Sequence, residues 1–404
     1  MAGLLPLEEA QARLLALASP LPAETVPVEH APGRTLAAPL LAQRTQPAAD
    51  LSAMDGYAVR ADDLAGPWQV VGESAAGHPF PGTVIAGEAV RIATGAVVPA
   101  GAGAVVLQEN VARADDHLAL TDRAPDPPHR HIRHTGMDYR AGDSLLPAGT
   151  LVGPAQLALA ITAGHAELAV HRRPRLAIID SGDELVAAGQ PTLPHQLPAS
   201  NGAMLAAMAA PLAANIARLG PVGDSMAALA EAFARAGDAE VIVTSGGASV
   251  GDHDLIRPAL AAWGADLAFW KVAIKPGKPI LIARREGESG TQLVVGLPGN
   301  PVSSFVTAQL FLLPLLRALG GTATSMPAAI PARLGASLPP TGPRREFLRA
   351  RWNGAEAIAA EQHDSGALAS LALANALIDR PANAPAADAG DPVTIHLLQF
   401  GGIA

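Results

Sequence analysis

Short apolar runs alternate with helix-like stretches between residues 175 and 325. The runs are rich in Leu, Ile and Val, and they lie at 176–179, 240–244 and 292–295. Helix caps are expected at Ser200–Asn201 and Asp224–Ser225, and Pro211 should end the first of these helices. This alternation is typical of βαβ units, so we predict an α/β domain with a mostly parallel sheet at 175–325.

A different pattern occupies residues 45–136, which are dense in Gly, Pro, Val and Thr. Short strand-like runs such as 68–71 and 89–92 stand between turn residues, which predicts a small β domain. A helical pattern follows at 151–163. We therefore expect the β domain to be inserted into a helical N-terminal domain, whose two parts are 1–44 and 137–174.

The pattern changes again from about Met326. Helical periodicity disappears, and apolar and polar residues alternate at 393–397, after a turn at Asp388–Asp391. This predicts a C-terminal β-barrel-like domain at 326–404. The expected fold class is thus multidomain α/β plus β.

Length and charge agree with this division. A chain of 404 residues exceeds the usual size of one hydrophobic core, so two to four domains are expected. The net charge of -9 and pI near 5.7 argue against nucleic acid or an anionic membrane as a partner, so any anion site must be local.

Several features favour the cytoplasm. The chain has no cysteine, which excludes disulfides and thiolate metal sites. The N-terminal segment from Leu5 to Leu15 resembles a helix with Pro6 in its first turn and lacks the pattern of a signal peptide. The apolar segment 305–319 is too short to span a membrane and contains Pro314, so we predict a buried helix there.

A glycine-rich loop follows the strand that ends at Thr244. It runs from Ser245 to Asp254 and holds Gly246, Gly247 and Ser249. Glycines let backbone N–H groups turn toward a ligand, hydroxyls add donors, and a following helix adds a positive dipole. The loop could cradle a phosphate, although a ligand-free turn is the alternative.

Three lysines lie within the nine residues from Lys271 to Pro279. Two prolines and a glycine fix the backbone around Lys275 and Lys278. Such a run is normally a solvated face. Beside the glycine-rich loop of an acidic protein, it instead predicts a local oxyanion site.

A second strand-to-helix turn lies at 296–304. Pro301 stands near the start of the helix, and Ser303 follows in the first turn. We predict that the free N–H groups of this turn form a second anion site, with Pro298 and Asn300 beside it.

Three carboxylates follow strands on the same predicted sheet edge: Glu184, Asp224 and Asp254. Each alone would be a helix cap or a surface acid. Carboxylates beside phosphates repel them unless a cation such as Mg²⁺ lies between, or unless one carboxylate binds a nucleoside hydroxyl. Together they predict a metal and nucleotide site.

One further cluster, His129, His131 and His134, could suggest a metal site. It lacks flanking acids or cysteines at ligand spacing, so an exposed linker or channel strand is the preferred interpretation.

Read together, these motifs resemble the molybdopterin molybdotransferase family, which includes the bacterial MoeA-type enzymes and the E domain of gephyrin. The resemblance covers nearly the whole chain. The matching stretches are 52–58, 91–96, 181–185, 245–251, 271–279 and 296–301.

The resemblance implies an elongated homodimer with four subdomains per chain and an active cleft between subunits. It also implies the reaction: molybdate and adenylylated molybdopterin are the substrates, molybdenum joins the dithiolene, and AMP leaves in an Mg²⁺-dependent step. Candidate protein partners are molybdopterin adenylyltransferase and molybdopterin synthase.

Motif matching assigns roles to individual residues. Lys275, Lys278 and Ser303 would hold molybdate or the pterin phosphate, with Lys271 nearby. Asp254, Glu184 and Asp224 would serve metal, nucleotide or hydrolysis. Asp55 and Thr94 would reach in from the partner subunit. Further substrate contacts are assigned to Arg344, Arg349, Ser365 and Asp138, although Arg349 could equally be an exposed strand residue.

The chain departs from the family pattern at Leu51, Met137, Ala199 and His363–Asp364. We expect retained activity with altered local hydrogen bonding. Two rival functions are less favoured. The extra domains on both sides argue against a molybdopterin adenylyltransferase-like enzyme, which resembles the α/β domain alone. The retained Asp55, Asp254, Lys275 and Lys278 argue against a gephyrin-like scaffold, although a second binding role stays open. Sequence does not separate molybdate from tungstate.

Overall fold

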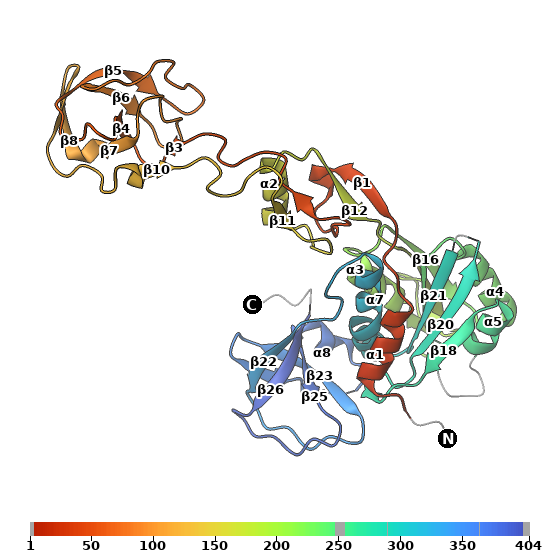
Figure 1. Ribbon diagram of the computed structural model, residues 1–404. Coiled ribbons are helices and arrows are strands. Elements are labelled where there is room, and N and C mark those ends of the chain that lie inside the picture. The colour runs from red at the N-terminus through yellow and green to blue at the C-terminus, as the bar shows by residue number, and fades with distance from the viewer. Residues whose placement is uncertain (1–3, 247–254, 289, 363, 399–404) are drawn as a thin grey trace.

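The computed structural model describes residues 4–246, 255–288, 290–362 and 364–398. The molecule is elongated (Figure 1), with a small β unit at one end, a narrow middle part, and a larger body that contains the first and the last described segments of the chain. The larger body holds the central α/β sheet and a C-terminal barrel. The multidomain α/β plus β fold predicted from the sequence is confirmed.

The central sheet has six strands in the order β16-β13-β17-β21-β20-β18. Neighbours among the first four strands pair in parallel, whereas β20 pairs with β21 and with β18 antiparallel. The sheet is therefore mostly parallel, as the apolar runs predict. In chain order the strands are β13 (Arg175–Ser181), β16 (Asn215–Val222), β17 (Val241–Ser245), β18 (Asp266–Trp270), β20 (Leu281–Gly287) and β21 (Gly290–Leu297).

Helices cover both faces of this sheet. One face packs against α4 and α5, and the other against α1, α3 and the segment from α6 to α7. Ser225 caps α4 by accepting a hydrogen bond from Ala228 N at 3.2 Å, whereas Ser200 makes no side-chain cap. These helices are α1 (Leu7–Ala16), α3 (Asn201–Ala209), α4 (Met226–Arg235), α5 (Ile256–Ala262), α6 (Pro301–Thr307) and α7 (Leu313–Leu319).

The segment Pro301–Leu319 is continuous, because the π-helical turn η4 (Ala308–Leu312) joins α6 to α7. Among the described residues it is the one helix long and apolar enough to cross a membrane, and 89% of its apolar window is buried inside the protein. It belongs to the core cluster of the sheet. The predicted buried helix is confirmed, but the prediction that it is too short to span a membrane is wrong, because the helix begins at Pro301 and not at Phe305.

The narrow middle part is built mainly from strand pairs. β1 (Ala23–Pro27) pairs with β12 (Glu167–His171), β2 (Leu40–Leu41) pairs with β11 (Ser144–Leu146), and α2 (Pro154–Thr162) packs beside them. Helix α1 buries its apolar face in the core of the α/β sheet instead. The expected helical N-terminal domain thus differs from the structure, because Leu7, Ala10 and Leu14 find a larger apolar surface there.

The β unit between β2 and β11 is a six-stranded sheet in the order β7-β4-β6-β5-β9-β8, with β3 and β10 paired at its base. Trp68 and Leu118 are fully buried between its strands. The strands are β3 (Leu51–Ser52), β4 (Gly56–Val59), β5 (Trp68–Ser74), β6 (Glu88–Ile92), β7 (Ala104–Leu107), β8 (Val111–Ala114), β9 (His117–Leu120) and β10 (Ile132–Arg133).

The C-terminal part closes into a five-stranded barrel, because β25 pairs with both β26 and β23. A sixth short strand from the α/β part, β19 (Ile274–Lys275), adds to β23 in parallel. One helix, α8 (Leu368–Ala372), interrupts the expected helix-free stretch after Met326. The barrel strands are β22 (Ala329–Leu334), β23 (Arg345–Trp352), β24 (Glu356–Ala359), β25 (Ala376–Arg380) and β26 (Pro392–Leu397).

Candidate active site

Two adjoining cavities lie in the larger body. The larger has a volume of about 940 Å³ and opens at the carboxyl ends of the parallel strands, where ligands bind in open α/β sheets. The smaller, of about 540 Å³, lies between the α/β part and the barrel. Pro279 lines both cavities. The cavities are therefore neighbouring compartments of one region.

The larger cavity is acidic. Its described lining includes the carboxylates of Asp180, Glu184 and Asp224, and no Lys, Arg or His. The lining also includes four residues of the predicted phosphate turns or next to them: Gly246, Pro298, Asn300 and Asn201. The structure thus brings Glu184 and Asp224 to one sheet edge, as their positions after strands predict.

The turn after β17 requires glycine at position 246. Gly246 has φ +103°, and a Cβ there would lie 2.3 Å from the carbonyl oxygen of Ser181. Asn201 secures the neighbouring loops, because its Nδ2 donates to Ser245 Oγ at 2.9 Å and to the Gly299 carbonyl at 2.6 Å. These bonds hold the start of α3 against the end of β17 and the turn after β21, beside the larger cavity.

The exposed carboxylates of this cavity stand on two linked loops. Asp224 N donates to Asp183 Oδ1 at 2.9 Å, and Asp183 N donates to Asp224 Oδ2 at 3.4 Å. Glu184 follows Asp183 directly and is also exposed. The pairing holds the loop after β13 against the loop after β16, so Glu184 and Asp224 share one wall.

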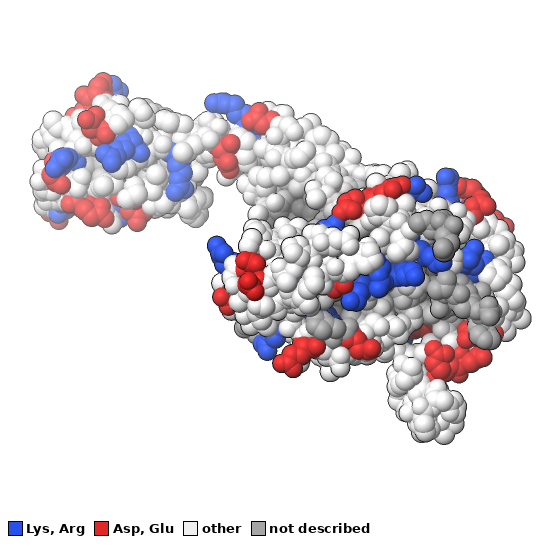
Figure 2. Space-filling model, turned by 90° about the horizontal axis from the view of Figure 1, so that it is seen from below, with Lys and Arg blue, Asp and Glu red and all other residues white. Residues whose placement is uncertain are grey.

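The smaller cavity is basic. Five cationic side chains line it against two carboxylates, a formal excess of three positive charges in a chain with net charge -9. Figure 2 shows Lys and Arg side chains in a run across one face of the larger body, with acidic side chains at its margins. The five cations are Lys275, Lys278, Arg344, Arg349 and Arg380, and the carboxylates are Glu346 and Asp364.

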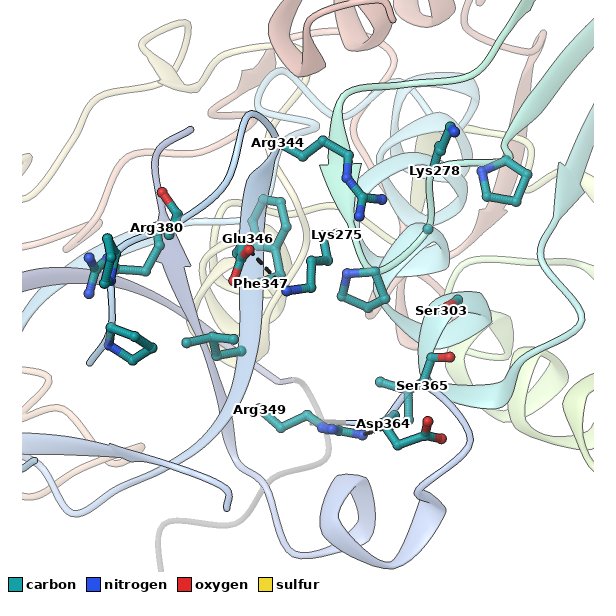
Figure 3. A pocket seen from close by; sticks show the side chains of 18 residues that line it. Lys275, Lys278, Ser303, Arg344, Glu346, Phe347, Arg349, Asp364, Ser365 and Arg380 are labelled. Atoms are coloured by element: carbon teal, nitrogen blue, oxygen red, sulfur yellow. Dashed lines mark hydrogen bonds and ion pairs between the residues drawn. The ribbon is translucent and has the colours of Figure 1, made fainter. Parts of the chain in front are cut away.

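One ion pair lies in the wall of the smaller cavity (Figure 3). Lys275 Nζ lies 3.1 Å from Glu346 Oε1, and the two residues are register partners in the β19–β23 pairing. The lysine side chain is 53% exposed, whereas the glutamate side chain is only 14% exposed. Glu346 therefore orients an ammonium group whose other N–H donors stay available to a ligand.

Arg349 is buried, so the alternative of an exposed strand residue is wrong. Its guanidinium donates to the carbonyls of Gln362, Asp364 and Ala367, which belong to the loop before α8. Burial lowers the pKa of Arg349, and the charge of Asp364 opposes that shift. Arg349 thus shapes the wall of the cavity by holding this loop.

The same loop reaches α6. Asn300 Nδ2 donates to Ser365 Oγ at 2.9 Å, and Val302 N donates to the Ser365 carbonyl at 3.0 Å. The prediction that the N–H groups of this turn are free for an anion is therefore wrong for Val302, because the barrel loop already occupies that donor. Ser303 itself is buried and lines the smaller cavity.

Some predicted site residues lie elsewhere. Lys271 lines neither cavity, because its Nζ sits 3.7 Å from the centroid of the Trp270 ring, a cation–π contact. Asp138 is exposed in the segment that returns from the inserted β unit. Three predicted residues, Gly247, Ser249 and Asp254, lie outside the described residues, as does His363.

Asp55 and Thr94 meet in the inserted β unit. Asp55 Oδ1 accepts hydrogen bonds from Thr94 N at 2.7 Å and from Thr94 Oγ1 at 2.9 Å, and these bonds lower the pKa of Asp55. The strands beside them, β4 and β6, lie at the far end of the molecule from the central sheet (Figure 1). Within one chain, the structure does not bring this pair to the cavities.

Comparison with known proteins accounts for the whole architecture. A molybdopterin molybdenumtransferase from Nostoc is 34% identical over 392 residues, covering 93% of this chain and 88% of the relative. The chain belongs to this family. Three family models match in order: the MoeA N-terminal region (domains I and II) at 5–164, a probable molybdopterin binding domain at 177–318, and the MoeA C-terminal region (domain IV) at 331–398.

Other members of the family agree. Molybdopterin molybdenumtransferase 2 of Mycobacterium tuberculosis is 36% identical, with 92% of this chain and 94% of the relative covered. The crystal structure of a molybdopterin biosynthesis MoeA protein from Pyrococcus horikoshii superposes with a TM-score of 0.79 at 30% identity, and covers 98% of this chain and 99% of that one.

Against the family pattern, the departures take different positions. Ala199 is buried and lines the larger cavity, and Leu51 lies in β3 opposite Arg133. Met137 is 70% exposed. Ala199 lines the larger cavity, and Asp364, from the fourth departure, lines the smaller one, so these two departures have a direct route to ligand binding.

Sequence reasoning did not assign to the site three carboxylates that line the cavities: Asp180, Glu346 and Asp364. Asp180 ends an apolar strand run, and a charged residue at that point is a signal that could have been used. Glu346 offers no such signal, because its place beside Lys275 depends on a strand pairing between two separate parts of the chain.

The histidine cluster shows no metal geometry. The rings of His129 and His134 are 5.6 Å apart, and His134 Nδ1 lies 3.1 Å from Asp50 Oδ2. Burial and the charge of Arg130 lower the pKa of His131. Among the described residues, no group of three or more His, Asp or Glu side chains could hold a metal ion.

Proposed function

We propose that this protein inserts molybdate into adenylylated molybdopterin and releases AMP. Beyond family membership, the observation that carries the proposal is the junction of a basic and an acidic cavity at one sheet edge. An oxyanion needs the first compartment, and a nucleotide with a neutral heterocycle suits the second. An adenylyltransferase-like activity is less favoured, because relatives named molybdopterin molybdenumtransferase match nearly the whole chain.

The smaller cavity supports oxyanion binding. Lys278 has no carboxylate partner among the described residues, and Lys275 keeps N–H donors free beside Glu346. Ser303 and Ser365 add hydroxyl groups from two directions (Figure 3). A tetrahedral dianion would be neutralised by the ammonium groups and oriented by the hydroxyls. Arg344 and Arg349 complete the wall.

The larger cavity supports an Mg²⁺ site in which the protein supplies only some of the ligands. Glu184 and Asp224 share one wall, but the described carboxylates do not form a closed three-ligand cluster. Mg²⁺ commonly keeps several waters and uses one or two carboxylates together with substrate phosphates. Glu184 and Asp224 would hold the ion in this way, with Asp254 as a third candidate. The bound ion would neutralise phosphate charge beside these acids.

A homodimer would complete the site. Asp55 and Thr94 form a defined pair, yet they lie at the far end of the same chain. If they act on the substrate, they must do so in the cleft of a partner subunit. We also propose a cytoplasmic location, supported by the acidic charge and the absence of cysteine.

The test is AMP release from adenylylated molybdopterin by the purified protein. We expect release only when molybdate and Mg²⁺ are both present, and molybdenum should then be bound to the pterin dithiolene. Sulfate in place of molybdate is the matched control. Release that ignores molybdate would contradict the insertion reaction. Competition between molybdate and tungstate in the same assay will define oxyanion preference.

A further inference from the structure

Asp180 is a buried carboxyl group in the larger cavity that the proposed metal and oxyanion sites do not use. It lies near the carboxyl end of β13, is 5% exposed and belongs to the cavity lining. Its Oδ2 accepts a hydrogen bond from Gly202 N at 3.0 Å. Its Oδ1 is buried and has no hydrogen-bond partner among the described residues.

Two glycines make room for this carboxyl group. A Cβ at Gly202 would lie 2.1 Å from Asp180 Oδ2, and a Cβ at Gly220 would lie 3.1 Å from Asp180 Cβ. Side chains are thus excluded on two sides, from the start of α3 and from β16. The fold accommodates a buried carboxyl group here although one of its oxygens gains no partner, and buried polar groups without partners are uncommon.

Neighbouring acceptors share the same condition. Asn201 uses its Nδ2 to bind Ser245 and Gly299, and its Oδ1 is buried without a partner in the described part of the chain. The hydroxyl oxygen of Ser181 is likewise buried and unpaired there. Burial raises the pKa of Asp180, and the single hydrogen bond from Gly202 N opposes that shift. A ligand that satisfies these groups must therefore present hydrogen-bond donors.

A heterocycle with N–H groups satisfies these buried acceptors better than a metal ion would. Hard cations prefer carboxylates that also reach water, and in this cavity those are Glu184 and Asp224. Asp180 and Asn201 instead offer a carboxylate oxygen and an amide oxygen in an enclosed position. The 2-amino group and ring N–H of a pterin form a donor pair of complementary chemistry.

We infer that Asp180, together with Asn201, accepts hydrogen bonds from the amino and ring N–H groups of the pterin and thereby determines heterocycle specificity. The inference rests on the proposed function, because it requires a pterin to enter the larger cavity. It assigns Asp180 a binding role distinct from the metal role proposed for Glu184 and Asp224.

The experiment compares two fluorescent probes, pterin and lumazine, by titration against the full-length protein without molybdate or Mg²⁺. Lumazine carries an oxygen where pterin carries the 2-amino group. We expect the protein to bind pterin more tightly by roughly tenfold or more, because lumazine would leave a buried acceptor unpaired. Asp180→Asn places a donor at the same position and should invert the preference toward lumazine.

The ratio of the two affinities separates specificity from folding, because a partly folded variant loses both ligands equally. Asp266→Asn removes an exposed carboxylate on β18 and should leave the ratio unchanged. An unchanged ratio in an Asp180→Asn variant that unfolds cooperatively like the unmodified protein, or no binding of pterin to the unmodified protein, would each overturn the assignment. The titration measures binding and no turnover, so it tests only the role of Asp180. Failure of molybdate insertion would instead appear in the AMP-release assay.

Discussion

The two cavities differ in charge although they share a wall. The smaller is lined by five cations and two carboxylates, and the larger by three carboxylates without a described cation. Average composition could not reveal this, since the chain as a whole is acidic. The difference teaches that anion affinity here is a local property, produced by bringing one lysine loop against the barrel strands β23 and β25.

The cavities also differ in construction. The larger is formed mainly by loops that follow neighbouring strands of a single sheet. The smaller depends on contacts between two parts of the chain, namely the β19–β23 pairing and the hydrogen bonds from Asn300 and Val302 to Ser365. Its geometry therefore depends on how the barrel docks, whereas the barrel contributes only Gly366 and Leu368 to the described lining of the larger cavity.

Removing Lys278 should give the largest loss of molybdate affinity. If the affinity did not fall, the proposed difference between a basic oxyanion cavity and an acidic one would be wrong. Lys278→Ala deletes an ammonium group of the basic cavity that has no carboxylate partner among the described residues. We expect molybdate affinity to fall by roughly 100-fold, the loss of one or two charge-assisted hydrogen bonds. Equilibrium dialysis with radiolabelled molybdate measures this.

Lys271→Ala is the matched control for that experiment. It removes the same charge from the same loop, but this ammonium lies over Trp270 and outside both cavities. Molybdate affinity should stay within about twofold, because a solvent-screened charge at that position contributes little. Equal losses in the two variants would show that charge in the loop, rather than cavity geometry, governs binding.

Changing the exposed acids should give an intermediate effect confined to the larger cavity. Glu184→Gln combined with Asp224→Asn should raise the Mg²⁺ concentration for half-maximal AMP release by about tenfold or more, because two candidate ligands lose their charge. Molybdate affinity in dialysis should be unchanged. A matching loss of molybdate binding would show that the cavities are not functionally separate.

Neutralising Glu346 should produce a smaller change of opposite sign. Glu346→Gln keeps a hydrogen-bond acceptor beside Lys275 but removes a negative charge from the basic cavity. We expect oxyanion affinity to rise by about three- to tenfold, with weaker discrimination between molybdate and sulfate. The dialysis assay with sulfate competition checks this. Weaker molybdate binding would mean that orientation of Lys275 by the charged pair outweighs repulsion.

The smallest effect concerns stability as a function of pH. Burial alone would raise the pKa of Asp379, but hydrogen bonds from His396 and Arg345 outweigh it, so the folded-state pKa is lowered. This group stabilises the fold above its unfolded pKa, and the contribution disappears as pH falls through the lower folded value. Asp379→Asn should therefore remove part of the acid-induced loss of unfolding free energy.

Asp180 should show the opposite dependence, because burial raises its folded-state pKa. Its contribution is present below the unfolded pKa and is lost as pH rises through the raised folded value. Asp180→Asn should flatten this limb of the pH profile, because an amide does not titrate there. Urea unfolding at a series of pH values measures both variants. For each variant, the difference in free energy of unfolding from the unmodified protein is plotted against pH. If these two differences changed with pH in the same direction, the assigned pKa directions would be contradicted.

Much of this arrangement could be predicted from the sequence because it depends on local patterns. Apolar runs located β13, β17 and β21, and the rule that ligands bind beyond strand ends placed Glu184, Asp224 and Gly246 together. The side-chain partners of Lys271 and Arg349 could not be predicted in this way. Both depend on contacts with the fold that leave no periodic signal, an aromatic ring in one case and three backbone carbonyls in the other.

The position of helix α1 escaped prediction for a related reason. Its amphipathic pattern predicts a helix but does not say which apolar surface the helix will cover. In the structure that surface is the α/β core, and the ion pair between Glu8 and Arg345 also ties α1 to β23. Amphipathic patterns identify buried faces, whereas their partners follow from competition among all available surfaces.

The inserted β unit is reached through two chain segments that run side by side. Gln46 and Tyr139 exchange backbone hydrogen bonds in both directions, at 2.9 and 3.3 Å, and Gly136 N donates to the Pro47 carbonyl at 2.9 Å. A double-stranded tether bends less freely than a single flexible linker, whose end-to-end distance fluctuates widely. It works as a fixed spacer between Asp55 and the cavities of its own chain. If catalysis needs both, turnover in very dilute solution will track the population of paired chains instead of the total protein present.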